Sequence, residues 1–383
     1  AQLAKNNGIH DAIGLVGAND SNGLAWTLFV SAGFSLSEHP DRVLEKAFAF
    51  FDQHPDVPYI VVAAADGLSL RNLYRPKGTE RLIKDGYYIP SMPDSSALLV
   101  LARRERVEAI RGFAFDDVDE SKVRAEEANR RSLSRRLALA HSHLSKVVPK
   151  SEGALARNPT VAEWLTESAR LARRSEFQAQ ATVSHVSSMF KSSGDDVVHV
   201  PANYKPSPWF PVPWAKWQLA MFDELPTLGY LHRPTYIKLT DDKGQPLPRK
   251  DLRMAALAAG WQQALLTLPE AQRKAAPTRI ISSTGGNTDK GIALSRVIHG
   301  QAEAGGPELD PSKTSQWIDA DARLGNTGAA TWFMQMGIGV MGSYIDGGVS
   351  AAVNLRSDHE ASVIFISPPP DAMRKKQGVA VFK

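Results

Sequence analysis

The chain has 383 residues, of which 43% are hydrophobic and 22% are charged, proportions typical of a globular protein with a sizeable core. Its formal net charge of +4 is small for this length, so charge alone does not favour nucleic-acid binding. The sequence contains no Cys, which excludes disulfides, thiolate metal sites and a cysteine nucleophile.

The first part of the chain has the alternating pattern of a layered α/β protein. Residues 39–51 carry apolar side chains at helical spacing, and residues 59–65 form a continuous apolar run, which is typical of a strand buried on both faces. A second apolar run follows at 95–101, and after it a charged helical pattern ends at Arg111. We therefore expect residues 1–115 to form an N-terminal α/β half.

Residues 116–216 have a different character. Residues 119–147 give a long helical pattern rich in Arg, Lys and Glu, and a second helical stretch runs to about Phe190. Five prolines between 201 and 213 exclude regular helix or a central strand there. We predict that this middle region is a helical and Pro/Trp-rich insertion on the core.

The α/β pattern returns in residues 217–383, which we expect to form a C-terminal half. The pattern predicts a strand, a helix stopped by Pro269, a second strand, a Gly-rich turn with its helix, and a closing β-hairpin with a charged tip. In chain order these lie at 235–240, 252–268, 279–282, 284–298 and 351–367.

The stretch Gly325–Ala330 is the most informative motif, because of the residue that it lacks. It resembles the Gly-His-Thr-Gly-Ala-Ala run that opens a buried helix in ketosynthases and related thiolase-fold enzymes, but Asn326 stands in the place of their acyl-binding His. With this motif, the order of elements in both halves favours an α/β fold with a thiolase-like layered core, mixed sheets packed with helices. Asn326 would then be a former-active-site position, expected to be a buried structural residue that caps the helix at Thr327.

The loop Thr284–Lys290 resembles a phosphate-binding loop. It lacks the spacing of a P-loop, so we favour an ordinary strand-to-helix turn in which Asn287, Thr288 or Asp289 caps the helix. Gly-x-Ser-x-Gly, the motif of a hydrolase serine, does not occur in the chain. These observations leave no catalytic motif in view.

The histidines offer no clear catalytic or metal site either. His141 and His143 are two residues apart, so a helix would point them in different directions rather than at one metal ion. His299 and His359 could each act as a general base, but neither has a partner that is visible in the sequence. We therefore expect a protein that is not an enzyme and that binds no metal or cofactor.

The longest uncharged run, Leu324–Ile345, could cross a bilayer by its length alone. Its five glycines make it only weakly apolar, so a buried core helix is the favoured interpretation and we expect a cytoplasmic protein. The chain begins at Ala1 rather than Met, so an anchor or signal ahead of it would not be visible, and membrane contact is left open.

Two segments could bind a partner protein. Four aromatic residues lie among prolines within nine positions, and such rigid aromatic clusters bind partners at low entropy cost: Trp209, Phe210, Trp214 and Trp217. The alternative is that they anchor this connection to the core. A basic stripe that includes Arg130, Arg131 and Arg135 is either a solvated helix face or a docking face for an acidic protein. It lacks the interleaved aromatics that would favour nucleic acid.

Several stretches carry a resemblance to a known family: Trp214–Arg233 with the Pro-Thr-Tyr-Ile-Lys-Leu that follows it, Ala259–Leu265, Thr284–Asn287 and Ala351–Pro370. They resemble the type VI secretion lipase adaptor (Tla) family of Gram-negative bacteria. The resemblance implies a non-enzymatic adaptor that captures a phospholipase effector and hands it to the secretion spike, a VgrG-type protein. It brings no catalytic residues with it.

The chief alternative is an altered thiolase-fold protein that still binds or transfers an acyl or CoA-like ligand. An open tunnel beneath Asn326, lined by His299 or His359, would favour that alternative. Side chains that fill the same region would favour the adaptor.

Overall fold

The computed structural model describes residues 40–116, 122–124, 204–205, 210, 213–378 and 381. These residues divide into two compact units. Of the described residues, the first unit comprises 49–62, 100–116, 122–124, 204–205, 210 and 213–225, and the second comprises 40–48, 63–99, 226–378 and 381.

A six-stranded mixed sheet organises the second unit, in the order β3-β8-β7-β5-β6 with β4 also paired to β8. β5 runs parallel to β6 and β7, whereas β8 is antiparallel to β7, β3 and β4. The strands are β3 Tyr230–Leu231, β4 Thr235–Lys238, β5 Arg279–Ser283, β6 Trp317–Asp319, β7 Ser350–Asn354 and β8 Glu360–Ser367.

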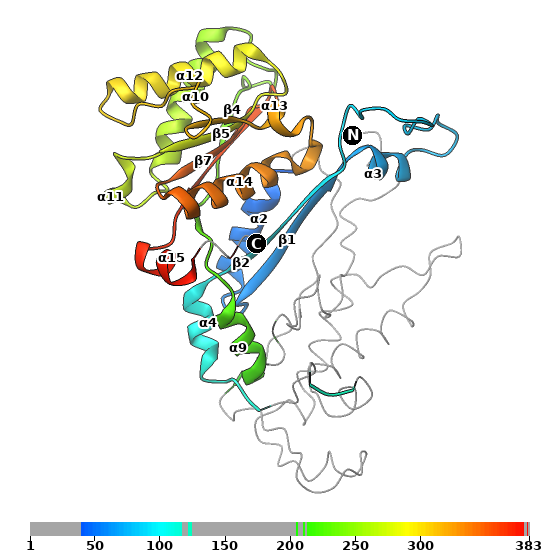
Figure 1. Cartoon of the computed structure of the whole chain (residues 1–383). Helices are drawn as coiled ribbons and strands as arrows, with labels where there is room; N and C mark the ends of the chain where they lie inside the picture. Colours follow the sequence, from blue (N-terminus) through cyan, green and yellow to red (C-terminus); the bar gives the residue numbers. More distant parts are fainter. Residues whose placement is uncertain are drawn as a thin grey trace, which may run out of the picture. The chain divides into compact units, whose positions relative to one another are not determined.

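Three long helices cover both faces of this sheet (Figure 1). They are α10 Lys250–Leu265, α12 Thr288–Glu303 and α14 Thr331–Asp346. Because successive strand residues point to opposite faces, Ile280 packs with α10 and α12 while Ile281 lies beneath α14. All of β5 is buried, including its polar residues Arg279, Ser282 and Ser283.

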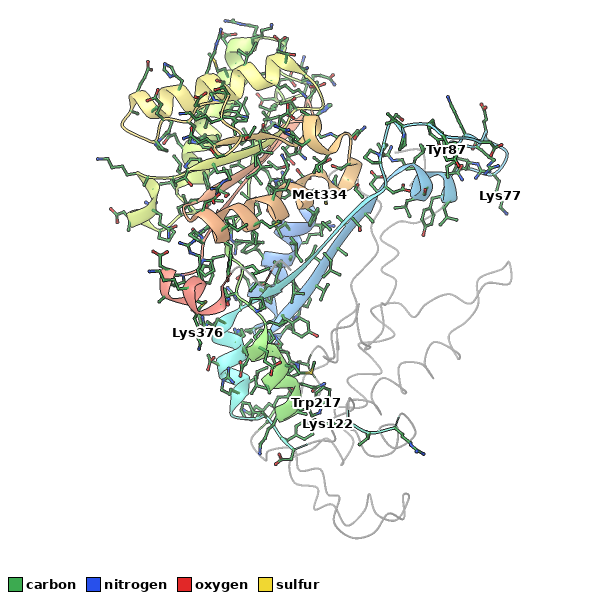
Figure 2. All side chains as sticks on the ribbon, in the orientation of Figure 1. Lys77, Tyr87, Lys122, Trp217, Met334 and Lys376 are labelled. Atoms are coloured by element: carbon green, nitrogen blue, oxygen red, sulfur yellow. The ribbon has the colours of Figure 1, made fainter. Side chains whose placement is uncertain are left out.

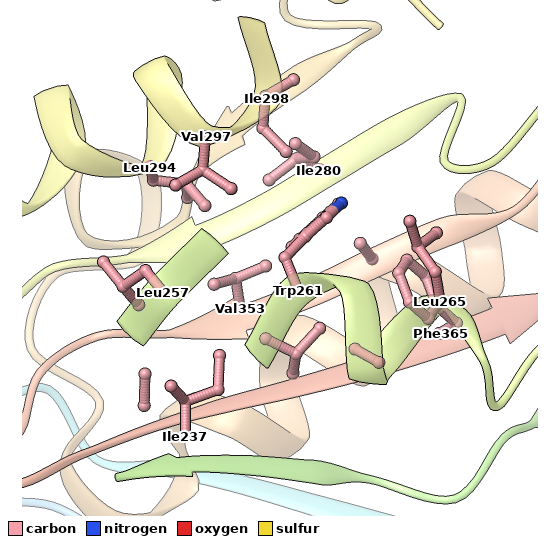
Figure 3. Packing of buried hydrophobic residues seen from close by; sticks show 14 of the residues in the cluster. Ile237, Leu257, Trp261, Leu265, Ile280, Leu294, Val297, Ile298, Val353 and Phe365 are labelled. Atoms are coloured by element: carbon pink, nitrogen blue, oxygen red, sulfur yellow. The ribbon is translucent and has the colours of Figure 1, made fainter. Parts of the chain in front are cut away.

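The main hydrophobic core lies between the sheet and helices α10 and α12 (Figure 3). Trp261 is 1% exposed and meets the ring of Phe365 edge to face at 5.5 Å. Gly260 lets α10 approach β4 closely, because a Cβ at this position would lie 2.4 Å from the side chain of Ile237. Burial of this layer is the principal source of stability for the unit.

Shorter helices complete the second unit: α3 Leu68–Leu73, α11 Glu270–Arg273, α13 Ala320–Leu324, the 3-10 turn η4 Gly328–Ala330 and α15 Asp371–Gln377. Three elements contribute residues to both units: helix α2 Arg42–Gln53 and the two strands β1 Tyr59–Asp66 and β2 Ser95–Ala102, which form a two-stranded sheet.

The first unit contains helices α4 Arg104–Arg111 and α9 Lys216–Glu224. They enclose a second core rich in aromatic residues, in which the rings of Tyr59 and Trp214 lie 5.6 Å apart. A bidentate ion pair between Arg111 and Asp223 links α4 to α9, with N–O distances of 2.7 and 2.9 Å.

The predicted α/β class is confirmed, and the thiolase-like core stays a prediction. The closing hairpin is present as β7 and β8, and the predicted helix at 252–268 is α10. The proposed divisions at 115/116 and 216/217 also stay predictions, because most of residues 116–216 lies outside the described part of the chain. Within that described part, no helix is long and apolar enough to span a bilayer.

Candidate functional site

Asn326, the residue that stands in the place of the ketosynthase His in the sequence motif, lies in the turn between α13 and η4. Its Oδ1 accepts the backbone N–H of Gly328 at 3.1 Å and a hydrogen bond from the guanidinium of Arg356. Asn326 is half-buried rather than buried, and it caps neither helix, because the N-cap residues are Thr327 for η4 and Ala330 for α14. The α-helix itself begins at Thr331, after the 3-10 turn, and not at Thr327.

Thr331 is the centre of the same network. Its Oγ1 donates to the carbonyl of Gly328 at 2.8 Å and lies 2.8 Å from Oγ1 of Thr327. Arg356, which follows β7, donates to Thr331 as well as to Asn326. The polar groups of Asn326, Thr331 and Arg356 therefore bind other groups of the protein.

Asp66, at the end of β1, contacts this turn from the other side. Its carboxylate accepts the N–H of Ala329 at 2.8 Å and two hydrogen bonds from Arg71 at 2.7 and 2.8 Å. Burial raises the pKa of Asp66, but the hydrogen bonds from Arg71, Ala329 and Gly67 outweigh that effect and hold it below its ordinary value. The carboxylate is therefore charged at neutral pH, next to the N-terminal end of a helix, where negative charge is stabilising.

Asp41, at the start of α2, is the carboxyl group with the most perturbed titration in the described residues. It is 7% exposed, and Nδ2 of Asn354 donates to its Oδ2 at 3.0 Å. Burial raises the pKa of Asp41 to about 6, although hydrogen bonds with Ser362 and Asn354 act in the opposite direction. A raised pKa is typical of functional carboxyls, but buried structural groups show it too.

The loop that resembled a phosphate site is filled by the protein's own carboxylate. Asp321 accepts the backbone N–H groups of Thr284 at 2.7 Å and Gly285 at 2.8 Å, and the hydroxyl of Ser283 at 2.8 Å. Of the three expected capping residues, Asn287 is the N-cap, and it accepts the N–H of Lys290 at 3.3 Å. The loop is therefore an ordinary strand-to-helix turn that binds an internal anion.

The two candidate general bases, His299 and His359, are both exposed. His299 is on α12, 3.5 Å from the exposed Glu303 one turn later, and His359 is at the exposed tip of the hairpin. Sequence patterns did not reveal a third histidine, His232, whose Nε2 lies 2.7 Å from Oγ of Ser367. Ser367 is only 3% exposed, so this pair is a packing contact and not an accessible nucleophile.

The aromatic segment lies largely inside the first unit. Phe210 and Trp214 are 3% and 1% exposed, and Trp217 packs partly buried against the same cluster. Figure 2 labels Trp217 on α9. This burial favours the core-anchoring interpretation for Phe210 and Trp214. Trp209 lies outside the described residues.

The basic stripe of Arg130, Arg131 and Arg135 also lies outside the described residues, so its role in partner binding stays a prediction. The residues that the sequence did not reveal are Asp66, Asp321 and Arg356. Each contacts a segment at least 25 positions away, so no local spacing could have shown it. Within the described ranges, no group of three or more His, Asp or Glu side chains could hold a metal ion.

Two family models match the chain. The model described as type VI lipase adapter protein Tla3, N-terminal, matches residues 1–85, and the model described as type VI lipase adapter protein Tla3, C-terminal, matches residues 228–368. The second match spans the whole six-stranded sheet, from β3 to the end of β8. It includes Asn326, Thr331 and Arg356. The chain therefore belongs to the type VI lipase adapter protein family and acts as an adapter for a lipase effector.

Proposed function

We propose that the protein is a non-enzymatic adaptor that binds a phospholipase effector on one surface and delivers it to a VgrG-type spike on another. The lipase part of this role follows from the family. The transfer to the spike and the lack of catalysis are our proposals, and the chemistry of the described residues supports the second of them.

The observation that carries the non-enzymatic role is the closed network around Asn326. The guanidinium of Arg356 donates both to Oδ1 of Asn326 and to the hydroxyl of Thr331. Asn326 also accepts the N–H of Gly328, and Thr331 donates to the carbonyl of the same residue. An acyl-transfer site needs hydrogen-bond donors directed at the substrate oxygen. Here Arg356 donates to the protein itself, which fixes the start of α14 and stabilises a rigid scaffold.

Rigidity suits a protein whose task is to bind. A preorganised surface loses little conformational entropy when it meets its partner, so more of the contact energy contributes to affinity. The sheet of the second unit, covered by helices on both faces, is such a scaffold. An adaptor of this kind needs no chemical step, only two surfaces that are occupied together.

Co-purification from the native host tests this function. The tagged 383-residue chain, purified without chemical crosslinking, should recover both a phospholipase and a VgrG-type protein. Mass spectrometry would identify them. A parallel titration with palmitoyl-CoA should give no saturable binding. Recovery of neither protein would overturn the adaptor, and saturable binding of palmitoyl-CoA would favour the acyl-transfer alternative.

A further inference from the structure

The connection between α3 and β2, residues 74–94, has an unusually apolar surface, and we call it the exposed loop. Tyr87 is fully exposed, Ile89 is 96% exposed and the adjacent Leu73 is 71% exposed. Between 77 and 91 only Ile83 is half-buried, and every other residue is exposed. Figure 2 labels Lys77 and Tyr87 on this loop. Water-exposed aromatic and branched side chains grouped in this way mark interaction sites rather than ordinary surface.

The exposed loop is held in a defined shape by its own hydrogen bonds. Asn72 accepts the N–H of Leu82 through its side chain at 2.9 Å, and Arg75 donates to the carbonyl of Asn72 at 2.8 Å. The hydroxyl of Tyr88 accepts the N–H of Lys84 at 3.2 Å. Loops of this length without regular structure are uncommon in compact domains and are usually either functional or linker segments.

The base of the exposed loop is fixed to the helix that precedes it. Asp94 accepts the N–H of Ser69 at 2.9 Å. Gly67 has φ +151°, and a Cβ there would lie 2.1 Å from Oδ1 of Asp94, so only glycine allows this close approach. The apolar tip is therefore presented from an anchored base, which lowers the entropy cost of binding through it.

The exposed loop also carries charged side chains, of which Lys77, Arg81 and Lys84 are basic and Glu80 and Asp85 are acidic. Lys77 and Lys84 are exposed and make no ion pair with any residue that the structure describes, while Arg81 lies 4.0 Å from Asp85 in an exposed, weak pair. Such a surface fits a partner that offers an apolar depression with carboxylates at its rim. The charges would guide the encounter and the apolar groups would supply most of the affinity.

We propose that the exposed loop binds the lipase effector, with Tyr87 and Ile89 buried in an apolar depression of that protein and Lys77 and Lys84 facing carboxylates at its edge. The inference rests on the adaptor function. The lipase is the partner that we assign because the chain belongs to a family of lipase adapters, and because Tyr87 and Ile89 are exposed in the described part of the chain.

The test measures binding of the full chain to the purified phospholipase effector of the same bacterium by titration calorimetry. The variant Tyr87→Ser/Ile89→Ser should bind about thirtyfold more weakly, as expected when central apolar contacts are lost. The variant Lys77→Glu/Lys84→Glu should bind more weakly at low salt and lose most of the salt dependence of the unmodified chain. Both pairs are exposed, so circular dichroism should show unchanged folding.

The matched control is Leu266→Ser/Ile292→Ser, which removes two exposed apolar side chains, 56% and 47% exposed, from α10's end and from α12. It should bind the lipase like the unmodified chain. Equal binding by the Tyr87→Ser/Ile89→Ser variant would overturn the inference and leave the adaptor function standing. Failure of the unmodified chain to bind the lipase would overturn both. Lipase binding retained, with loss of binding only to anionic phospholipid vesicles, would assign the loop to a membrane instead.

Discussion

The carboxylate of Asp66 accepts the backbone N–H of Ala329 at 2.8 Å, which connects the end of β1 to the first turn before α14 across 263 positions of sequence. The same carboxylate forms a bidentate pair with Arg71. This residue therefore holds together two segments of the second unit that no local pattern relates. Its effects on stability follow from that position.

The change Asp66→Ala should lower the free energy of unfolding by about 2–3 kcal/mol, because it leaves the Ala329 N–H and the Arg71 guanidinium without their acceptor. Urea titration monitored by tryptophan fluorescence would measure the difference. Asp85→Ala, at an exposed position in the same unit, is the control and should change stability by less than about 0.5 kcal/mol. Equal effects of the two changes would contradict a structural role for Asp66.

Gly328 has φ +56°, and a Cβ at this position would lie 2.0 Å from Oδ2 of Asp66. Gly328→Ala should therefore add a steric clash to the backbone cost of a left-handed alanine. Gly244 has φ +77° with open space around it, so Gly244→Ala carries the backbone cost of about 1 kcal/mol alone. Thermal unfolding should place Gly328→Ala well below Gly244→Ala in midpoint temperature. A smaller loss at Gly328 would show that Asp66 does not pack there.

The raised pKa of Asp41 makes part of the stability depend on pH. Since the folded-state pKa is about 6 and the ordinary value is 3.8, the folded state binds more protons between these values. The contribution is fully present below pH 3.8 and is lost as the pH rises through 6, an amount of roughly 3 kcal/mol. Asp41→Asn should remove this loss, so the variant should gain stability relative to the unmodified chain as the pH rises from 4 to 7. A pH-independent difference between the two proteins would rule this account out.

The elements themselves were largely predictable from the sequence. The strand at 360–367 is almost wholly buried, in keeping with its mainly apolar sequence. Helix α10 ends at Leu265, a few residues before the stop that Pro269 predicted. The sequence left three candidates for the N-cap of α12, because Asn287, Thr288 and Asp289 are all good capping residues and follow one another. The structure selects Asn287.

The long-range contacts of the candidate site residues were not predictable from the sequence. Asp321, which binds the loop after β5, lies 36 positions further along the chain than Gly285. The amino-acid sequence of the loop itself does not show whether it binds an internal carboxylate or a phosphate. The burial of Trp214 was equally undecided, since a tryptophan among prolines fits both an anchor and a binding surface. Only the tertiary structure selects between such alternatives.

Removal of the internal anion should turn that loop into a weak anion site. Asp321→Ala leaves the N–H groups of Thr284 and Gly285 unpaired beside the N-terminus of α12. We expect the variant to lose about 2 kcal/mol and to regain part of its midpoint temperature in 50 mM sulfate.

Asp310→Ala is the control for this experiment, because Asp310 accepts hydrogen bonds from exposed Ser312 only within its own turn. It should show no greater response to sulfate than the unmodified chain. Identical sulfate responses of all three proteins would mean that Asp321 does not occupy an anion-binding loop.

The most direct test of the adaptor role is the amount of phospholipase effector that the native host exports through its type VI system, with and without this protein. The account predicts that deletion of the protein abolishes export of the lipase, leaves its cellular level unchanged and spares the secretion of other type VI substrates. Undiminished export of the lipase in the deletion strain would contradict it.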